Sequence, residues 1–224
     1  MARIHGVAGE WARVRGTVVG LWPLFLGVFV SGGALVLTWI TPPMGGVILG
    51  LSLIFVIWSI MVGFHRIERF YKGARGEEKI SWILESLPST YHVFNDFTVG
   101  RNHIDHVVVG PSGVFAIETK FWSGKVTIED GFVLVDGRLP SRAPLSQANR
   151  EATLVRNALC DAGWNGMVTP VLVFASDSFE AHRANIKGTV IINSNELRES
   201  FATDRVVIPP LELDRLVSLM ENRP

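Results

Sequence analysis

The chain has 224 residues with 21 basic and 21 acidic side chains, a balance that by itself suggests one neutral soluble domain. All of these charges lie outside one 50-residue stretch, Gly16 to His65, which argues against a purely soluble protein. The single Cys160 excludes an internal disulfide framework and argues against a structural zinc site, and it suits a reducing compartment.

Two apolar runs fill the charge-free stretch. Leu21 to Ile40 and Met44 to Phe64 contain 20 and 21 residues, and each is long enough as a helix to cross about 30 Å of hydrocarbon. The connection Thr41-Pro42-Pro43 breaks a helix, so the second run is expected to return antiparallel to the first. A cleaved signal peptide would also begin with an apolar run, but this run is too long and no small-residue cleavage site precedes the second.

Basic residues flank the two runs and are absent from the turn between them. This asymmetry places both flanks in the cytoplasm, so we expect a multi-pass protein of the inner (plasma) membrane whose termini and remaining domain are cytoplasmic. The expected divisions are an N-terminal cytoplasmic segment (1–20), two transmembrane helices (21–40 and 44–64), a basic juxtamembrane linker (65–75) and a folded domain (76–224).

The folded domain is predicted to begin with a helix and continue with strands. Apolar residues recur at helical spacing from Ile80 to Leu87, and Pro88 ends the pattern. Turn sequences at Gly110-Pro111-Ser112-Gly113 and Glu129-Asp130-Gly131 suggest that consecutive strands form antiparallel hairpins. The five predicted strands are 91–97, 103–109, 114–120, 125–128 and 132–135.

After Pro144 the helical period returns as far as Leu159, and Gly163 closes the helix. Strands are predicted at 168–175 and 189–193, and helices at 195–201 and 211–221. A helix-to-strand step after a run of strands predicts an α/β fold with a mixed sheet covered by helices.

Charged side chains interrupt two of the predicted core strands. Glu118 and Lys120 are two residues apart and therefore share one face of their strand. If the Gly110–Gly113 turn forms a hairpin, partner residues have numbers that sum to about 223, which sets Asp105 opposite Glu118. Two carboxylates beside a lysine suit Mg²⁺ or Mn²⁺, which could polarise a phosphate and activate water, while the lysine orients that water or stabilises charge. The alternative is a salt-bridge cluster without chemistry.

Three further residues in the predicted strands have possible functional or structural roles. His103 shares a face with Asp105 and could bind a metal or contact a phosphate, or it could be an ordinary edge residue. His106 should face the other way, as a structural histidine does. Lys125 could contact a substrate phosphate or be surface charge.

Specific motifs in this region resemble the NERD (nuclease-related) domain, which is similar to the PD-(D/E)XK nuclease superfamily. The resemblance covers roughly Gly73 to Ala175. Its most specific part is the run Ile104-Asp105-His106-Val107-Val108-Val109-Gly110-Pro111-Ser112-Gly113-Val114-Phe115-Ala116-Ile117-Glu118-Thr119-Lys120, joined by Gly76-Glu77, Ser123-Gly124 and Pro144-Leu145-Ser146-Gln147. The fold that it implies is a restriction-endonuclease-like core.

The resemblance also implies roles for individual residues. Asp105 and Glu118 would be metal ligands, and Lys120 the catalytic lysine. Glu77, on the first helix, would reach the metal or its water, and Gln147 would hold the site or a substrate phosphate. Two positions depart from the usual pattern: Ile104 stands where the superfamily has proline, and Ala143 stands where the family often has asparagine.

Together these features predict a membrane-anchored, Mg²⁺- or Mn²⁺-dependent hydrolase of nuclease type that processes nucleic acid, DNA more than RNA. The alternative is a catalytically silent nuclease-fold module that binds nucleic acid or a protein partner at the membrane. Residues 66–224 carry 18 basic and 20 acidic side chains, a net charge of −2, which is not the footprint of a tight non-specific nucleic-acid binder.

Overall fold

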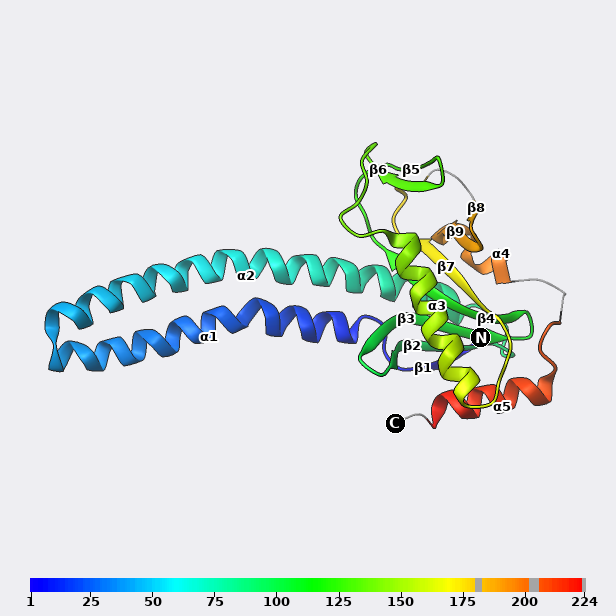
Figure 1. Cartoon of the computed structure of the whole chain (residues 1–224), viewed down its shortest axis with the longest axis horizontal. Coiled ribbons are helices and arrows are strands. Elements are labelled where there is room, and N and C mark those ends of the chain that lie inside the picture. The colour runs from blue at the N-terminus through cyan, green and yellow to red at the C-terminus, as the bar shows by residue number, and fades with distance from the viewer. Residues whose placement is uncertain (180–182, 202–205, 223–224) are drawn as a thin grey trace. The chain divides into compact units, whose positions relative to one another are not determined.

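The computed structural model describes residues 1–179, 183–201 and 206–222. The chain divides into two compact units, one formed by Glu10–Ala74 and the other by Met1–Gly9 together with Arg75–Pro224. Figure 1 shows the first unit as a pair of long helices and the second as a sheet with helices around it.

The first unit is a helical hairpin. Helix α1 (Glu10–Ile40) is followed, after Thr41, by α2 (Pro42–Glu85), so the helix breaks at the predicted prolines. Both helices are long and apolar enough to cross a membrane. Each is longer than the predicted span: α1 begins ahead of it, and α2 runs without a break through the basic stretch predicted as a linker.

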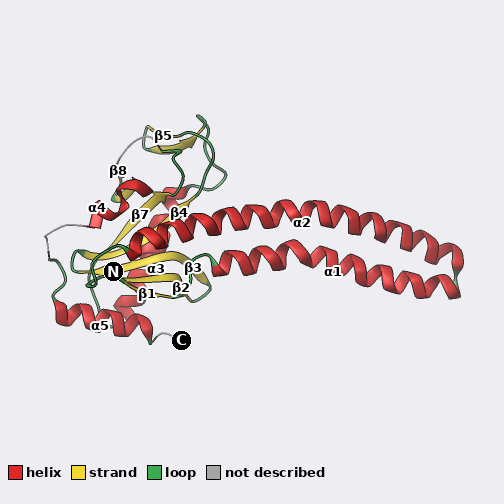
Figure 2. Ribbon diagram, turned by 180° about the vertical axis from the view of Figure 1, so that it is seen from behind, coloured by secondary structure: helices red, strands yellow, loops and turns green. Residues whose placement is uncertain are grey.

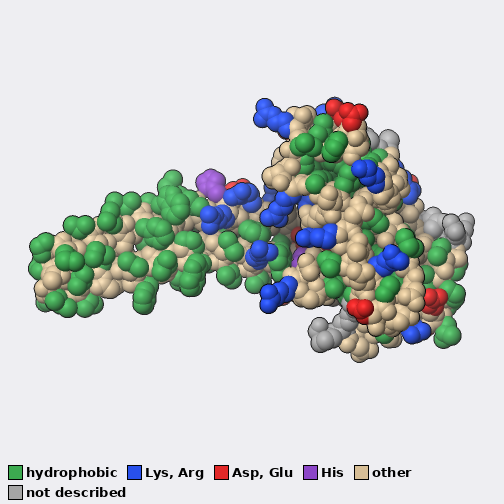
Figure 3. All heavy atoms as spheres, viewed as in Figure 1, with side chains coloured by type: hydrophobic (Ala, Val, Ile, Leu, Met, Phe, Trp, Pro, Cys, Tyr) green, Lys and Arg blue, Asp and Glu red, His purple; other side chains and the backbone are tan. Residues whose placement is uncertain are grey.

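Small residues allow the two helices of the hairpin to approach each other. A Cβ on Gly63 would lie 2.7 Å from the backbone oxygen of Gly20, and Ser31 Oγ donates a 2.8 Å hydrogen bond to Ser52 Oγ. Many outward side chains are apolar, with Trp39 88% exposed, and Figure 3 shows hydrophobic side chains along the visible face of the hairpin. Exposure of an apolar surface of this extent to water is unfavourable.

The second unit contains a seven-stranded mixed sheet with the order β1-β2-β3-β4-β7-β9-β8. Strands β2, β3 and β4 pair antiparallel, while β4 with β7 and β7 with β9 pair parallel, which confirms the predicted α/β fold with a mixed sheet. The strands are β1 (Arg3–His5), β2 (His92–Val99), β3 (Asn102–Gly110), β4 (Gly113–Lys120), β7 (Val168–Phe174), β8 (Arg183–Ile186) and β9 (Thr189–Asn193).

One predicted strand connection was wrong. β5 (Val126–Glu129) does not continue the run of hairpins after β4 but pairs with β6 (Phe132–Val135) in a separate two-stranded sheet, and Val126 forms one isolated bridge with Phe179. The open edge of β4 is occupied by β7, so β5 has no place beside it. Strands β1 and β8, which the sequence pattern did not predict, complete the two edges of the main sheet.

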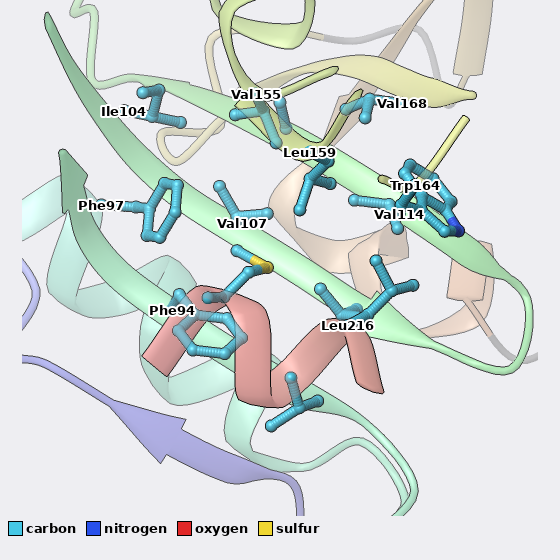
Figure 4. Packing of buried hydrophobic residues seen from close by; sticks show 14 of the residues in the cluster. Phe94, Phe97, Ile104, Val107, Val114, Val155, Leu159, Trp164, Val168 and Leu216 are labelled. Carbon is cyan, nitrogen blue, oxygen red and sulfur yellow. The ribbon is translucent and has the colours of Figure 1, made fainter. Parts of the chain in front are cut away.

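Helices cover both faces of the sheet, as Figure 2 shows. On one face, α3 (Pro144–Asp161) and α5 (Pro210–Glu221) bury a core that includes Val107, Val155 and Leu216 (Figure 4). The opposite core joins the last turns of α2, with Ile80 and Leu84, to the short helices η1 (Ser194–Glu196) and α4 (Leu197–Phe201). Alternate residues of the central strands face alternate cores, as the period of a strand requires.

The hairpin of β3 and β4 has the register that the sequence predicted. His106 pairs with Ile117 and Gly110 with Gly113, so partner numbers sum to 223. This register brings the charged ends of both strands to the same part of the sheet.

Candidate metal and catalytic centre

The end of β4 holds a buried carboxylate and a lysine on one face, as predicted. Lys120 Nζ donates a hydrogen bond to Glu118 Oε1, and the Glu118 side chain is only 3% exposed. Burial lowers the pKa of Lys120, but the charge of Glu118 and its hydrogen bond more than offset this, so the pKa lies above its ordinary value. The lysine is therefore an ammonium at neutral pH, a donor and a positive charge rather than a base.

Asp105 extends from β3, one residue beyond the last pair of the β3–β4 ladder. Its Oδ2 accepts a 2.8 Å hydrogen bond from the backbone N–H of Thr119, the residue between Glu118 and Lys120. This hydrogen bond holds the Asp105 carboxylate against the end of β4. Burial, followed by the neighbouring charge of Glu118 and then that of Glu77, raises the pKa of Asp105 well above its ordinary value. A cation bound beside this carboxylate would therefore stabilise its ionised form.

Glu77 enters the centre from α2 because the preceding residue has no side chain. A Cβ on Gly76 would lie 2.9 Å from Cβ of Phe121, so glycine lets the helix approach the end of β4. Burial, and then the charge of Asp96, raise the pKa of Glu77 to about 7, while His103 and a backbone hydrogen bond from Gly9 oppose the shift. This gives a physical reason for the Gly-Glu pair noted in the sequence.

Glu77, His103 and Asp105 form a group that could hold a metal ion, since one donor atom from each lies within 4.8 Å of the others. Within the described parts of the chain, Oε2 of Glu77 is buried without a hydrogen-bond partner, as expected where a cation would complete its coordination, whereas Glu118 also has a side-chain hydrogen bond with Glu151. Carboxylates suit Mg²⁺ and Mn²⁺, and the imidazole nitrogen suits a transition metal better than Mg²⁺.

The predicted ligands thus occupy one neighbourhood, although not in identical roles. Glu77 and Asp105 lie together with His103, whose Nε2 is 3.2 Å from Asp96 Oδ1 and 3.8 Å from Asp105 Oδ1. Glu118 accepts a hydrogen bond from Lys120, and its charge raises the pKa values of Glu77 and Asp105. Sequence reasoning missed Asp96, which has a left-handed backbone (φ 51°) and does not appear among the paired residues of β2.

A glutamine on α3 connects the lysine to a second buried acid. Gln147 Oε1 accepts a 3.1 Å hydrogen bond from Lys120 Nζ, and Gln147 Nε2 donates a 3.0 Å hydrogen bond to Glu151 Oε1. Burial, and then the adjacent charge of Glu118, raise the pKa of Glu151 to about 9, so this acid is neutral at pH 7. Glu151 was missed in the sequence, although its i+4 spacing from Gln147 places both on one helix face.

The remaining candidates lie elsewhere. His106 is fully buried, shares a 2.8 Å hydrogen bond with Asn95 Oδ1, and has a pKa lowered by burial to about 3, which suits the structural role. Lys125 lies at the base of the β5–β6 hairpin, where its backbone N–H donates to Asp136 Oδ1 at 2.8 Å.

Part of the chain is similar to known proteins. The family model described as "Nuclease-related domain" (NERD) matches residues 72–175. An uncharacterized protein of Bacillus anthracis is 37% identical over 60 residues, which are 24% of this chain and 28% of that protein. The crystal structure of protein VC1899 from Vibrio cholerae covers 85% of this chain and 51% of its own, with 12% identity and a TM-score of 0.29. The chain thus spans about half or less of the relatives it matches.

Proposed function

Starting from residues 72–175, which form a nuclease-related domain, we propose that the protein is a metal-dependent phosphodiesterase that cleaves nucleic acid at the cytoplasmic face of a membrane. The observation that supports this most is the ammonium of Lys120, which is bound by Glu118 and Gln147 next to a buried group of carboxylates. A structural salt bridge would not need the additional buried acids Glu77 and Asp105, whose pKa values are raised.

Glu77, Asp105 and His103 would hold the metal, with Glu118 beside them. A divalent cation in this position supplies Lewis-acid polarisation of a phosphate and a lower pKa for bound water. Lys120 contributes a fixed positive charge that stabilises the negative charge developing on the phosphate oxygens. Gln147 and Glu118 restrict where that ammonium lies, so that no reorganisation is needed during the reaction.

The membrane part of the proposal depends on the helical hairpin. Its outward side chains are apolar along 21–40 and 44–64, and the flanking arginines and lysines would remain on the cytoplasmic side. The domain would then meet only substrates that reach the inner face of the membrane.

The direct test uses the whole 224-residue chain in detergent, because Met1–Gly9 belong to the same compact unit as the domain and a shortened chain would lose β1. Single- and double-stranded DNA and RNA are incubated with Mg²⁺ or Mn²⁺, and Lys120→Met is compared with Lys187→Met, an exposed lysine in the turn between β8 and β9. We expect metal-dependent cleavage that Lys120→Met abolishes and Lys187→Met leaves unchanged.

Absence of cleavage on every substrate, with metal binding still measured by calorimetry, would favour the silent binding module. If metal binding were absent as well, the metal-dependent proposal would be wrong.

A further inference from the structure

A cavity of about 420 Å³ opens beside Lys120, at the point where β4 leaves the sheet. Its walls include Trp122, Val135, Pro140 and Arg142. Resting on the nuclease function proposed above, we propose that this cavity receives one unpaired nucleobase of the substrate, stacked on Trp122, while Arg142 contacts the strand's phosphate. The substrate class is then nucleic acid that offers an unpaired nucleotide.

The position of the cavity follows from the strand that carries the catalytic residues. β4 ends at Lys120 and Trp122 follows two residues later, and the side chains of both line the cavity. A base bound at Trp122 would bring its own phosphate near the Lys120 ammonium, within the length of a single nucleotide. The volume lies within the range of about 300–1,000 Å³ for small-molecule sites.

Residues outside the cavity hold Trp122 in place. Its ring centroid is 5.5 Å from that of Phe174, and its backbone oxygen accepts a 2.6 Å hydrogen bond from Ser176 Oγ. An aromatic ring that is held in place and lines a cavity is a feature on which proteins stack single-stranded bases.

The part of the lining formed by Val135 is also fixed by the fold. Val135 and Arg138 exchange two backbone hydrogen bonds, of 2.8 and 3.0 Å, and Asp136 Oδ1 accepts from the Lys125 N–H at 2.8 Å. A side chain on Gly124 would collide with the Asp136 carboxylate, so the Ser-Gly pair after β4 allows this wall to close. The cavity is therefore built into the fold and needs no ligand to form it.

Charge in the cavity suits a phosphodiester strand. Arg142 is exposed and forms no ion pair with any carboxylate in the described parts of the chain, so its guanidinium is available to a phosphate. The domain as a whole is not basic, since residues 66–224 have a net charge of −2. Phosphate contacts alone would then bind weakly, and stacking on Trp122 would supply affinity that does not depend on sequence.

A base inside an intact duplex cannot enter such a cavity, because both of its faces are stacked and its edge is paired. Single strands, frayed ends and flaps expose bases without this cost. We therefore expect preference for them over blunt duplex, whether the strand is DNA or RNA.

The test measures binding and cleavage separately on the whole 224-residue chain in detergent. Binding is followed by anisotropy of fluorescein-labelled dT12, rU12 and a blunt 12-base-pair duplex in Ca²⁺, and cleavage of the same molecules is followed in Mn²⁺. The variants are Trp122→Leu, which keeps apolar contact with Phe174 but removes the aromatic face, Trp122→Phe, which retains that face, and Arg142→Gln. Trp82→Leu is the control, since Trp82 lies on α2 outside the cavity and is 74% exposed.

We expect the wild-type protein to bind both strands about tenfold or more tightly than the duplex. Trp122→Leu should lose about tenfold in strand affinity, Arg142→Gln should lose less, and Trp122→Phe and Trp82→Leu should stay close to wild type, with thermal unfolding confirming that each variant is folded.

Equal binding of strand and duplex, no binding of either, or equal effects of Trp122→Leu and Trp82→Leu would overturn the inference. Strand binding that depends on Trp122 without any cleavage would support the cavity's role and refute the enzyme. Cleavage that Lys120→Met abolishes but Trp122→Leu does not alter would support the enzyme and refute the role of the cavity.

Discussion

Gln147 accepts a 3.1 Å hydrogen bond from Lys120 Nζ. A residue of α3, which begins 24 positions after the end of β4, thereby positions the ammonium group at the end of that strand. The same amide donates to Glu151, which holds its orientation, because the oxygen must face the lysine when the nitrogen faces the acid. The ammonium is thus positioned from two directions, by Glu118 on its own strand and by Gln147 on α3.

Replacing this glutamine should lower turnover without removing the metal. Gln147→Met keeps the length of the side chain but neither hydrogen bond, so we expect kcat on a single-stranded oligonucleotide to fall about 10- to 100-fold, with Mn²⁺ affinity unchanged. Arg156→Gln, at an exposed position of the same helix, is the matched control. A variant whose kcat equals that of the control would show that Gln147 does not position the lysine.

The affinity for the metal should fall as the pH is lowered, because Glu77 becomes protonated. Its pKa is raised to about 7, so the carboxylate is ionised at pH 8 and mostly protonated at pH 6, and a metal must displace that proton. Competition at this one group weakens Mn²⁺ binding about tenfold from pH 8 to pH 6. Isothermal titration across this range checks the value, and Glu77→Gln should flatten the dependence. An unchanged slope in that variant would assign the proton to another group.

The same raised pKa makes a prediction for stability. A proton on Glu77 favours the folded protein, fully below the ordinary value of 4.5, and this contribution is lost as the pH rises through about 7. For the metal-free protein the loss amounts to roughly 3 kcal/mol at most. Saturating Mn²⁺ should therefore raise Tm more at pH 8 than at pH 6. Equal shifts at both pH values would contradict a metal site that includes this carboxylate.

Packing at the turn of the β3–β4 hairpin can be tested away from the metal site. A Cβ on Gly110 would collide with the ring of Tyr91, whose hydroxyl donates a 2.8 Å hydrogen bond to the backbone oxygen of Phe201. Gly110→Ala should reduce the free energy of unfolding by about 1–3 kcal/mol, and Tyr91→Phe by about 1 kcal/mol. Gly131→Ala measures a different effect, the strain of alanine at a φ of +79° with nothing near its Cβ position, whereas Gly110 does not have a positive φ. Chemical denaturation ranks the three, and a Gly110→Ala variant as stable as wild type would disprove the close contact.

Local signals in the sequence were sufficient for the part of the site that lies on neighbouring strands. The Gly110–Gly113 turn fixes the register of β3 against β4, and alternation then places Glu118 with Lys120 and His103 with Asp105. The helical period likewise located α3 and the α2 residues that cover the sheet.

Contacts between segments distant in the chain could not be predicted in this way. Strand β1 has three residues and pairs with β2 almost 90 positions later, a distance at which no local pattern identifies a partner. Glu151 carries no local signal in the sequence, and only the packing of α3 on the sheet brings it beside Glu118. The separate β5–β6 sheet was missed because turn signals specify a hairpin but not which edge a strand joins.

The membrane topology can be tested at the single residue between the two helices. If α1 and α2 cross the inner membrane with both flanks in the cytoplasm, Thr41 lies on the outer side and Ser112, in the β3–β4 turn, lies inside. In a Cys160→Ser background, which removes the single native thiol, a membrane-impermeant maleimide should label Thr41→Cys in intact cells and label Ser112→Cys only after lysis. Labelling of both positions in intact cells would place the domain outside, and labelling of neither until lysis would show that the hairpin does not cross.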